Sequence, residues 1–196
     1  MGVIIDSHLT WKLHIDHISS KIAKNIGIII KARRIFDKET LHTLYHSFIF
    51  PYLNYCIHLW GSTYHSYISK LEVLQKRIIR IIAGVNRREH TKPLFNDLRI
   101  LTVNDLFEYN IGLFMYKHHH GWLPNVLNVF RKNSDIHDHD TRQANNLEIP
   151  KFDTGIGQRS FKYQAVKIWN NILKFLIVDI KIGTFKKYLK TYLIKQ

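Results

Sequence analysis

The stretch of residues 71–82 limits the possible folds most strongly, because it is apolar along one side of a helix and basic along another. Its apolar side chains recur at steps of three and four residues, the period of an α-helix with one apolar face: Leu71, Leu74, Ile78, Ile81 and Ile82. Gly84 is expected to end this helix, since glycine readily adopts the left-handed conformation that closes helices. The apolar side needs a core, so the stretch predicts a helix packed within a larger bundle.

The basic side of the same helix is suited to a polyanion, because guanidinium and ammonium groups bind phosphates. Two further arginines follow Gly84 in an expected turn. The predicted phosphate contacts are Lys70, Lys76, Arg77, Arg80, Arg87 and Arg88. A second basic patch is expected on the last helix, at Lys186, Lys187 and Lys190. Taken alone, such a face is more often a solvated surface than a binding site, so the rest of the chain decides.

Charge composition favours the binding interpretation. The chain of 196 residues has 29 Lys and Arg against 15 Asp and Glu, a formal net charge of +14. An excess of this size points to a polyanionic partner, with nucleic acid first and an anionic membrane surface second. No apolar run approaches the roughly 18 residues needed to cross a bilayer, and no signal-peptide pattern begins the chain. We therefore expect an intracellular protein whose partner is nucleic acid and not a membrane.

The hydrophobic fraction of 45% and the aromatic fraction of 13% are typical of a folded chain. The single cysteine, Cys56, excludes an internal disulfide and a zinc site made of several cysteines. It sits between Tyr55 and Ile57, which predicts a buried and inert thiol.

Periodicity elsewhere predicts a mainly α fold, a multi-helix bundle with a short N-terminal β-strand at residues 2–6. Long helical patterns run through residues 11–36 and through residues 160–176. Two further helices are expected, one beginning at a cap at Asp37 and one at a capping box formed by Thr102 and Asp105. A last helix is expected from a cap at Thr184 to residue 193. Residues 131–158 lose periodicity, so we expect an irregular loop region there, with one short strand near residues 147–149.

The loop region contains the densest group of side chains that could hold a metal ion: Asp135, His137, Asp138, His139 and Asp140. Such a group could serve metal-dependent phosphodiester hydrolysis. However, neighbouring residues in a loop seldom all reach one ion, and no distant ligands are identifiable. Local hydrogen bonds within turns are the favoured interpretation.

No catalytic or metal site is assigned. The triplet His118, His119 and His120 lies at an expected helix end, where the helix dipole accounts for it. Gly155 and Gly157 lack the strand and the third glycine of a dinucleotide-binding loop. The chain has no adjacent pair of aspartates of the kind that polymerases use to hold two metal ions.

Short motifs follow one another along nearly the whole chain. They include Gly2-Val3-Ile4-Ile5-Asp6, Leu9, Trp11, His14-Ile15, Leu44-Tyr45, Pro51-Tyr52-Leu53, Trp60-Gly61, Leu74-Gln75-Lys76-Arg77, His90-Thr91, Pro93-Leu94-Phe95, Phe114-Met115-Tyr116, Asp135-Ile136-His137, Thr141-Arg142, Ile168-Trp169-Asn170 and Phe185-Lys186. Each motif is weak, but their order and spacing are specific. The series resembles the C-terminal part of the reverse transcriptase of jockey-like non-long-terminal-repeat retrotransposons.

This resemblance implies three regions. Residues 1–10 would be the remnant of the primer-grip hairpin, residues 11–130 a thumb-like helical domain, and residues 131–196 a loop region plus C-terminal helices. The family's catalytic aspartates lie upstream of the primer grip, so the resemblance implies a fragment without catalysis or cofactor. A divalent metal would be expected only in the missing palm. The implied partners are RNA or an RNA–DNA duplex, and the upstream palm of the same polyprotein.

Two alternatives of other classes stay open from the sequence. One is a small metal-dependent nuclease that uses the loop at residues 135–140. The other is a remnant or a protein-interaction module without activity.

Overall fold

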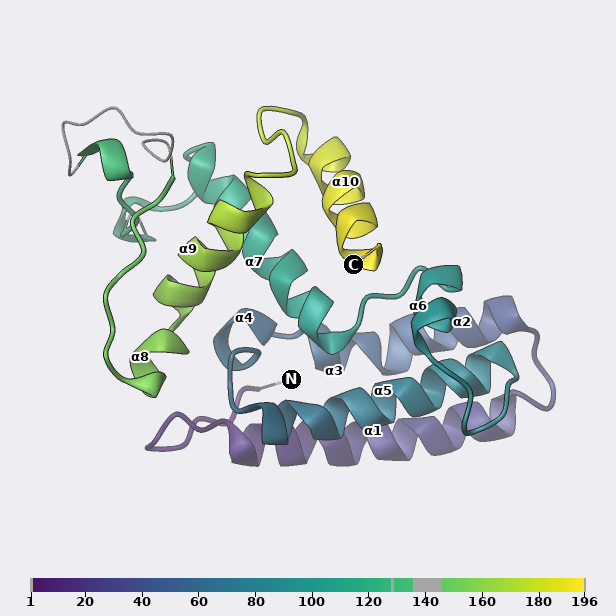
Figure 1. Cartoon of the computed structure of the whole chain (residues 1–196). Helices are drawn as coiled ribbons and strands as arrows, with labels where there is room; N and C mark the ends of the chain where they lie inside the picture. Colours follow the sequence, from purple (N-terminus) through teal and green to yellow (C-terminus); the bar gives the residue numbers. More distant parts are fainter. Residues whose placement is uncertain (1, 128, 136–145, 196) are drawn as a thin grey trace. The chain divides into compact units, whose positions relative to one another are not determined.

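The computed structural model describes residues 2–127, 129–135 and 146–195 and confirms a mainly α fold (Figure 1). The chain forms two compact units. The first comprises Met1–Phe107 with Ile194–Gln196, and the second comprises Glu108–Leu193. None of the helices that the structure describes is both long enough and apolar enough to cross a bilayer.

The N-terminal segment differs from the expected strand. No described residue forms a backbone ladder with residues 2–6, so no strand is present there. Instead the Asp6 carboxylate accepts hydrogen bonds from the backbone N–H groups of His8, Thr10 and Trp11, at 3.2, 2.9 and 2.8 Å. These bonds lower the pKa of Asp6, the Thr10 N–H contributing most. They fold the chain into a turn that leads directly into the first helix.

Two parallel helices form the frame of the first unit. α1 (Lys12–Ala32) and α5 (His65–Ala83) lie side by side and run in the same direction, while α2 (Lys38–Phe48) and α3 (Phe50–Asn54) return in the opposite one (Figure 1). The shorter α4 (Ile57–Trp60) and α6 (Lys92–Asp97) complete this unit. The predicted isoleucine stripe of α1 is buried throughout: Ile15, Ile18, Ile22, Ile26 and Ile29.

Several predicted boundaries hold and others shift by a few residues. The Asp37 side chain caps α2 by accepting the Thr40 N–H at 2.9 Å, as expected. Thr102 and Asp105 bond each other's backbone N–H groups at 3.3 and 3.2 Å, which confirms the capping box of α7 (Val103–His119). α1 ends at Ala32, earlier than residue 36. Cys56 is half-buried rather than buried, in a left-handed turn between α3 and α4.

The buried face of α5 is rotated relative to the predicted one. Ile79 and the polar Gln75 are fully buried, whereas Leu74 and Ile81 are only half-buried. The Gln75 amide donates to the Tyr45 hydroxyl at 3.0 Å and to the Leu101 carbonyl at 2.9 Å. A buried amide is tolerated only when it is bonded in this way, so Gln75 fixes α5 against α2 and against the segment that precedes α7.

The second unit packs the remainder of α7 with α9 (Phe161–Ile172) and α10 (Ile182–Ile194). A Cβ at Gly112 would lie 2.7 Å from the Leu189 side chain and 3.0 Å from that of Ile172, so glycine allows these helices to approach closely. The short helices are η1 (Asn125–Leu127), η2 (Asn133–Asp135) and α8 (Gly155–Gln158). α10 begins at Ile182, so the prediction that Thr184 caps it is wrong.

The strand expected near residues 147–149 is reduced to a single antiparallel bridge between Lys132 and Leu147. The side-chain amide of Asn170 takes the place of a second strand. Its Oδ1 accepts the Leu147 N–H at 2.9 Å, and its Nδ2 donates to the Leu147 carbonyl at 2.8 Å. Both backbone groups of a buried loop residue are thereby satisfied from a helix.

Candidate nucleic-acid interface

The end of α5 shapes the candidate surface. Gly84 adopts the left-handed conformation with φ 70°, and its N–H bonds the Ile81 carbonyl at 3.3 Å. The next N–H, of Val85, reaches back to the Arg80 carbonyl at 3.2 Å, which completes a Schellman motif. The predicted stop is therefore confirmed. It turns the chain so that Arg87 returns beside the helix it has just left.

Four arginines surround a surface depression of about 490 Å³ at this end of the first unit. Arg77 and Arg80 come from α5, Arg87 from the turn after it, and Arg33 from the end of α1. The other lining residues are mostly apolar: Ile30, Val73, Ile81, Val85 and Asn86. None of the described residues that line the depression is acidic, so the guanidinium groups meet no carboxylate there.

The local electrostatics explain how four guanidinium groups can gather. α1 and α5 are parallel, so the carboxyl ends of both helices lie at this depression. Each helix end carries a partial negative charge of about half an elementary charge, which offsets part of the repulsion between the arginines. In addition, the Nε–H group of Arg80 donates to the Glu89 carbonyl at 2.8 Å and so holds its guanidinium in one direction.

The other predicted contacts on this helix do not line the depression. Lys70 lies at the opposite end of α5, where its Nζ pairs with the Asp16 carboxylate at 2.5 Å. Both side chains are nearly half exposed, so this pair adds at most about 1 kcal/mol. Lys76 and Arg88 are exposed outside the depression. Their role in phosphate binding stays a prediction.

The predicted second patch lies on α10. Lys186 and Lys187 are exposed, and Lys190 is half-buried. Lys187 lines a separate depression in the second unit, together with aromatic side chains from the end of α7. The three lysines therefore do not form one uniform surface.

The histidine triplet is divided among three different environments. His118 packs edge to face with Phe130, with 4.9 Å between the ring centroids, and burial lowers the pKa of His118. His119 lies 3.2 Å from the Asp179 carboxylate, and His120 packs on Tyr116 at 4.3 Å. No cluster of three or more His, Cys, Asp or Glu able to hold a metal ion occurs among the described residues. The predicted loop at residues 135–140 lies outside them from residue 136 onward.

Arg33 is the residue of the depression that the sequence interpretation missed. It continues the buried series Ile15, Ile22 and Ile29 by one more helical turn, so a signal for its position was present. An arginine at the end of an apolar stripe lies beside whatever helix covers that stripe. The covering helix is α5, but that pairing is not contained in the local pattern of α1.

Curated proteins similar to this chain have closely related names. One is a probable RNA-directed DNA polymerase from transposon X-element of Drosophila melanogaster, 27% identical over 109 residues. Another is the RNA-directed DNA polymerase from mobile element jockey of Drosophila funebris, 26% identical over 108 residues. The Drosophila melanogaster protein of that same name is 26% identical over 109 residues.

Each match covers 54% of this chain and only 12% of the relative. No family model and no solved structure matches the chain. Over about half of the chain, the matches confirm the resemblance to jockey-like elements that the short motifs predicted.

Proposed function

We propose that this chain binds template–primer nucleic acid by contacting the phosphates of the nucleic acid. Over about half of its length the chain is related to RNA-directed DNA polymerases of jockey-like mobile elements. The observation that carries this proposal is the convergence of Arg33, Arg77, Arg80 and Arg87 on one depression. Guanidinium groups present forked donors that match phosphate oxygens two at a time. The first unit would thus act as a non-catalytic, thumb-like surface.

The arrangement suits recognition of the backbone rather than of the bases. Phosphate contacts position a protein on nucleic acid without reading its sequence. Arg77 and Arg80 stand on a rigid helix anchored by the buried Gln75, so their spacing is set before the nucleic acid arrives. Lys70, Lys76 and Arg88, with Lys186, Lys187 and Lys190, would add weaker and longer-range attraction.

The proposal assigns bond formation to a palm elsewhere in a longer polypeptide. The relatives are named as polymerases, and the matched segment makes up 12% of each of them. The divalent metal of such an enzyme would belong to that palm. RNA or an RNA–DNA duplex would be the partner of the present chain, with the palm as a second partner.

The experiment that tests this proposal compares two charge reversals of equal size. Arg77→Glu with Arg80→Glu should weaken binding of an RNA–DNA duplex at least about ten-fold, because two contacts become repulsive. Lys21→Glu with Lys24→Glu changes exposed lysines of α1 outside the depression and should change the affinity about two-fold or less. Fluorescence anisotropy measures both, and circular dichroism verifies folding. Equal affinity of the two folded variants would contradict the proposal.

The nuclease alternative predicts metal-dependent cleavage of RNA, which the binding proposal does not. Asp135→Ala with Asp138→Ala should leave duplex binding unchanged, because the proposal places the phosphate contacts on arginines and lysines and not on these aspartates. Cleavage of RNA by the purified wild-type chain in Mg²⁺, lost in this double variant, would overturn the non-catalytic assignment.

A further inference from the structure

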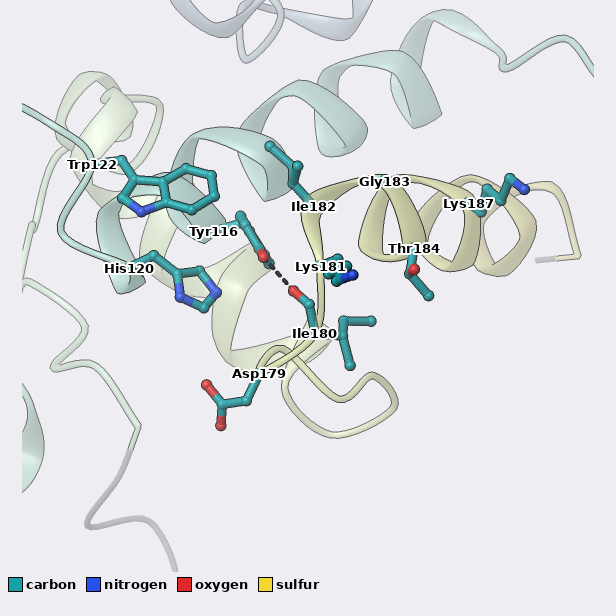
Figure 2. A pocket seen from close by; sticks show the side chains of 10 residues that line it. All are labelled: Tyr116, His120, Trp122, Asp179, Ile180, Lys181, Ile182, Gly183, Thr184 and Lys187. Carbon is teal, nitrogen blue, oxygen red and sulfur yellow. Dashed lines mark hydrogen bonds between the residues drawn. The ribbon is translucent and has the colours of Figure 1, made fainter.

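A second depression, of about 900 Å³, lies entirely within the second unit. Figure 2 shows its lining. Trp122 and His120 stand at one end, Lys187 at the other, and Lys181 and Thr184 between them. None of these residues belongs to the arginine-lined depression, so a ligand bound here would be independent of the proposed function.

The aromatic end of the depression is built by the turn that closes α7. Gly121 is left-handed with φ 66°, its N–H bonds the His118 carbonyl at 3.0 Å, and the Trp122 N–H bonds the Lys117 carbonyl at 2.9 Å. This second Schellman motif fixes where Trp122 leaves the helix. Trp122 is 57% exposed, so a large part of its side chain is open to a ligand.

The floor beneath the indole is rigid. Tyr116 is buried and stacks on Phe185, with 4.5 Å between the ring centroids. Its hydroxyl group donates a hydrogen bond to the Ile180 carbonyl (Figure 2). His120 must donate from Nε2 to the Val178 carbonyl, at 3.3 Å, because a carbonyl only accepts. Its ring lies 5.4 Å from that of Trp122, with 32° between their planes. The indole of Trp122 is therefore held in one orientation by its neighbours.

The charged groups are arranged along the rest of the depression. Lys181 directly precedes α10 and Lys187 lies on it, and both side chains are exposed. Asp179 also lines the depression, but its side chain is 80% exposed and lies 3.2 Å from His119. Figure 2 shows its carboxylate turned away from the two lysines. An aromatic face followed by cations matches the chemistry of a base followed by phosphates.

We propose that this depression binds an unpaired nucleotide of single-stranded RNA or DNA, with its base stacked on Trp122 and the adjoining phosphates at Lys181 and Lys187. Bases inside a duplex are already stacked on both faces, so the indole can take up an unpaired base but not an interior base pair. Stacking accepts any base, because every base has a π-face. The site therefore favours single strands without reading their sequence.

The test uses single-stranded oligo(U) and oligo(dT) of about 12 nucleotides, and a duplex of the same length, with the full chain. Trp122→Ala should weaken binding of both single strands about ten-fold and leave duplex binding within about two-fold. Trp122→Phe should restore most of the affinity, since phenylalanine still stacks. The matched control is Phe175→Ala, which removes an aromatic side chain 61% exposed in the same unit, outside the depression.

A spectroscopic readout tests the placement of the base. Trp60 and Trp169 are buried and Trp11, in the first unit, is half-buried, so Trp122 is the most exposed of the four indoles and quenching of intrinsic fluorescence by oligo(dT) should come mainly from it. Quenching should be lost in Trp122→Phe although binding persists. Unchanged quenching in that variant, or unchanged single-strand affinity in folded Trp122→Ala, would overturn the proposal. A wild-type chain that binds no single strand but self-associates through Trp122 in sedimentation would overturn it as well.

These outcomes are separable from those of the arginine-lined depression. Unchanged single-strand affinity in folded Trp122→Ala, with duplex binding still weakened in Arg77→Glu with Arg80→Glu, contradicts only the Trp122 site. Unaltered duplex binding in Arg77→Glu with Arg80→Glu contradicts only the proposed function.

Discussion

Tyr45 shows how a single buried group links α5 to solution conditions. Its hydroxyl is buried and accepts from Gln75, and burial raises its pKa from 10.0 to about 12. Because the folded state holds this proton more tightly, its contribution to stability is complete below pH 10. That contribution is lost as the pH rises from 10 to about 12.

A comparison of Tyr45→Phe with the wild type isolates this effect. The free energy of unfolding of the wild type should fall relative to that of the variant by on the order of 2 kcal/mol between pH 10 and 12. Urea unfolding at each pH measures the difference, in which the titration of lysines common to both proteins cancels. A difference that stays constant over this range would mean that the Tyr45 phenol titrates normally.

Asn170 carries a similar weight in the second unit, because its amide satisfies both backbone groups of Leu147. Asn170→Ala leaves two buried groups without partners and should cost about 2–4 kcal/mol. Asn170→Asp should not rescue the loss, since a carboxylate cannot donate to the Leu147 carbonyl. Asn171→Ala, at the exposed neighbouring position, should change stability by about 0.5 kcal/mol or less in the same thermal melts.

Single residues also mark where sequence interpretation stops. Asp6 and Trp11 belong to the series of motifs that resembles the reverse transcriptase family. The physical role of Asp6, however, depends on three backbone N–H groups that converge on its carboxylate. The burial of Gln75 likewise depends on Tyr45 and Leu101, which lie 30 and 26 residues away. Neither arrangement has a local pattern that periodicity could detect.

At the scale of elements, the helices themselves were largely predictable. The caps at Asp37 and at Thr102 with Asp105, and the stop at Gly84, are local signals and hold in the structure. Burial faces were less predictable, because the face of α5 that is covered depends on where α1 and α2 lie. The predicted strands failed for the same reason, since a strand needs a partner that its own residues do not specify.

Gly84 and Gly27 offer a matched pair of substitutions in helices. Gly84→Ala places a Cβ at φ 70° and should destabilise the chain by about 1–2 kcal/mol. Gly27 lies inside α1, and a Cβ there meets nothing within 4 Å. Gly27→Ala should therefore stabilise by about 0.5–1 kcal/mol. Chemical denaturation of both variants measures the two opposite signs, and a stabilising Gly84→Ala would contradict the Schellman closure.

At the scale of the whole molecule, a net charge of +14 makes salt dependence the most direct measure of binding. If Arg33, Arg77, Arg80 and Arg87 each neutralise one duplex phosphate, the slope of log Kobs against log[salt] should be about −3 to −4 or steeper. Arg33→Gln should reduce the magnitude of that slope by about one. Titrations between low and physiological salt measure both values, and a slope that Arg33→Gln leaves unchanged would exclude that residue from the contact.

The two units differ in how far the sequence described their candidate sites. In the first, three of the four arginines were predicted from one helix and the turn after it, and the fourth depends on the pairing of α1 with α5. In the second, Lys187 was predicted as part of a basic patch, while Trp122 was not singled out. Its exposure results from the turn at Gly121, which a sequence pattern does not reveal.

The parallel course of α1 and α5 has a consequence for insertions and deletions. Removing one residue of α1 between Ile15 and Arg33 would turn the Arg33 guanidinium by about 100° around the helix axis and shift it by about 1.5 Å along that axis, relative to Arg77. An added or lost residue in the loop before α5 would instead be absorbed without moving either arginine. Phosphate binding should therefore tolerate length changes between the helices but not within them.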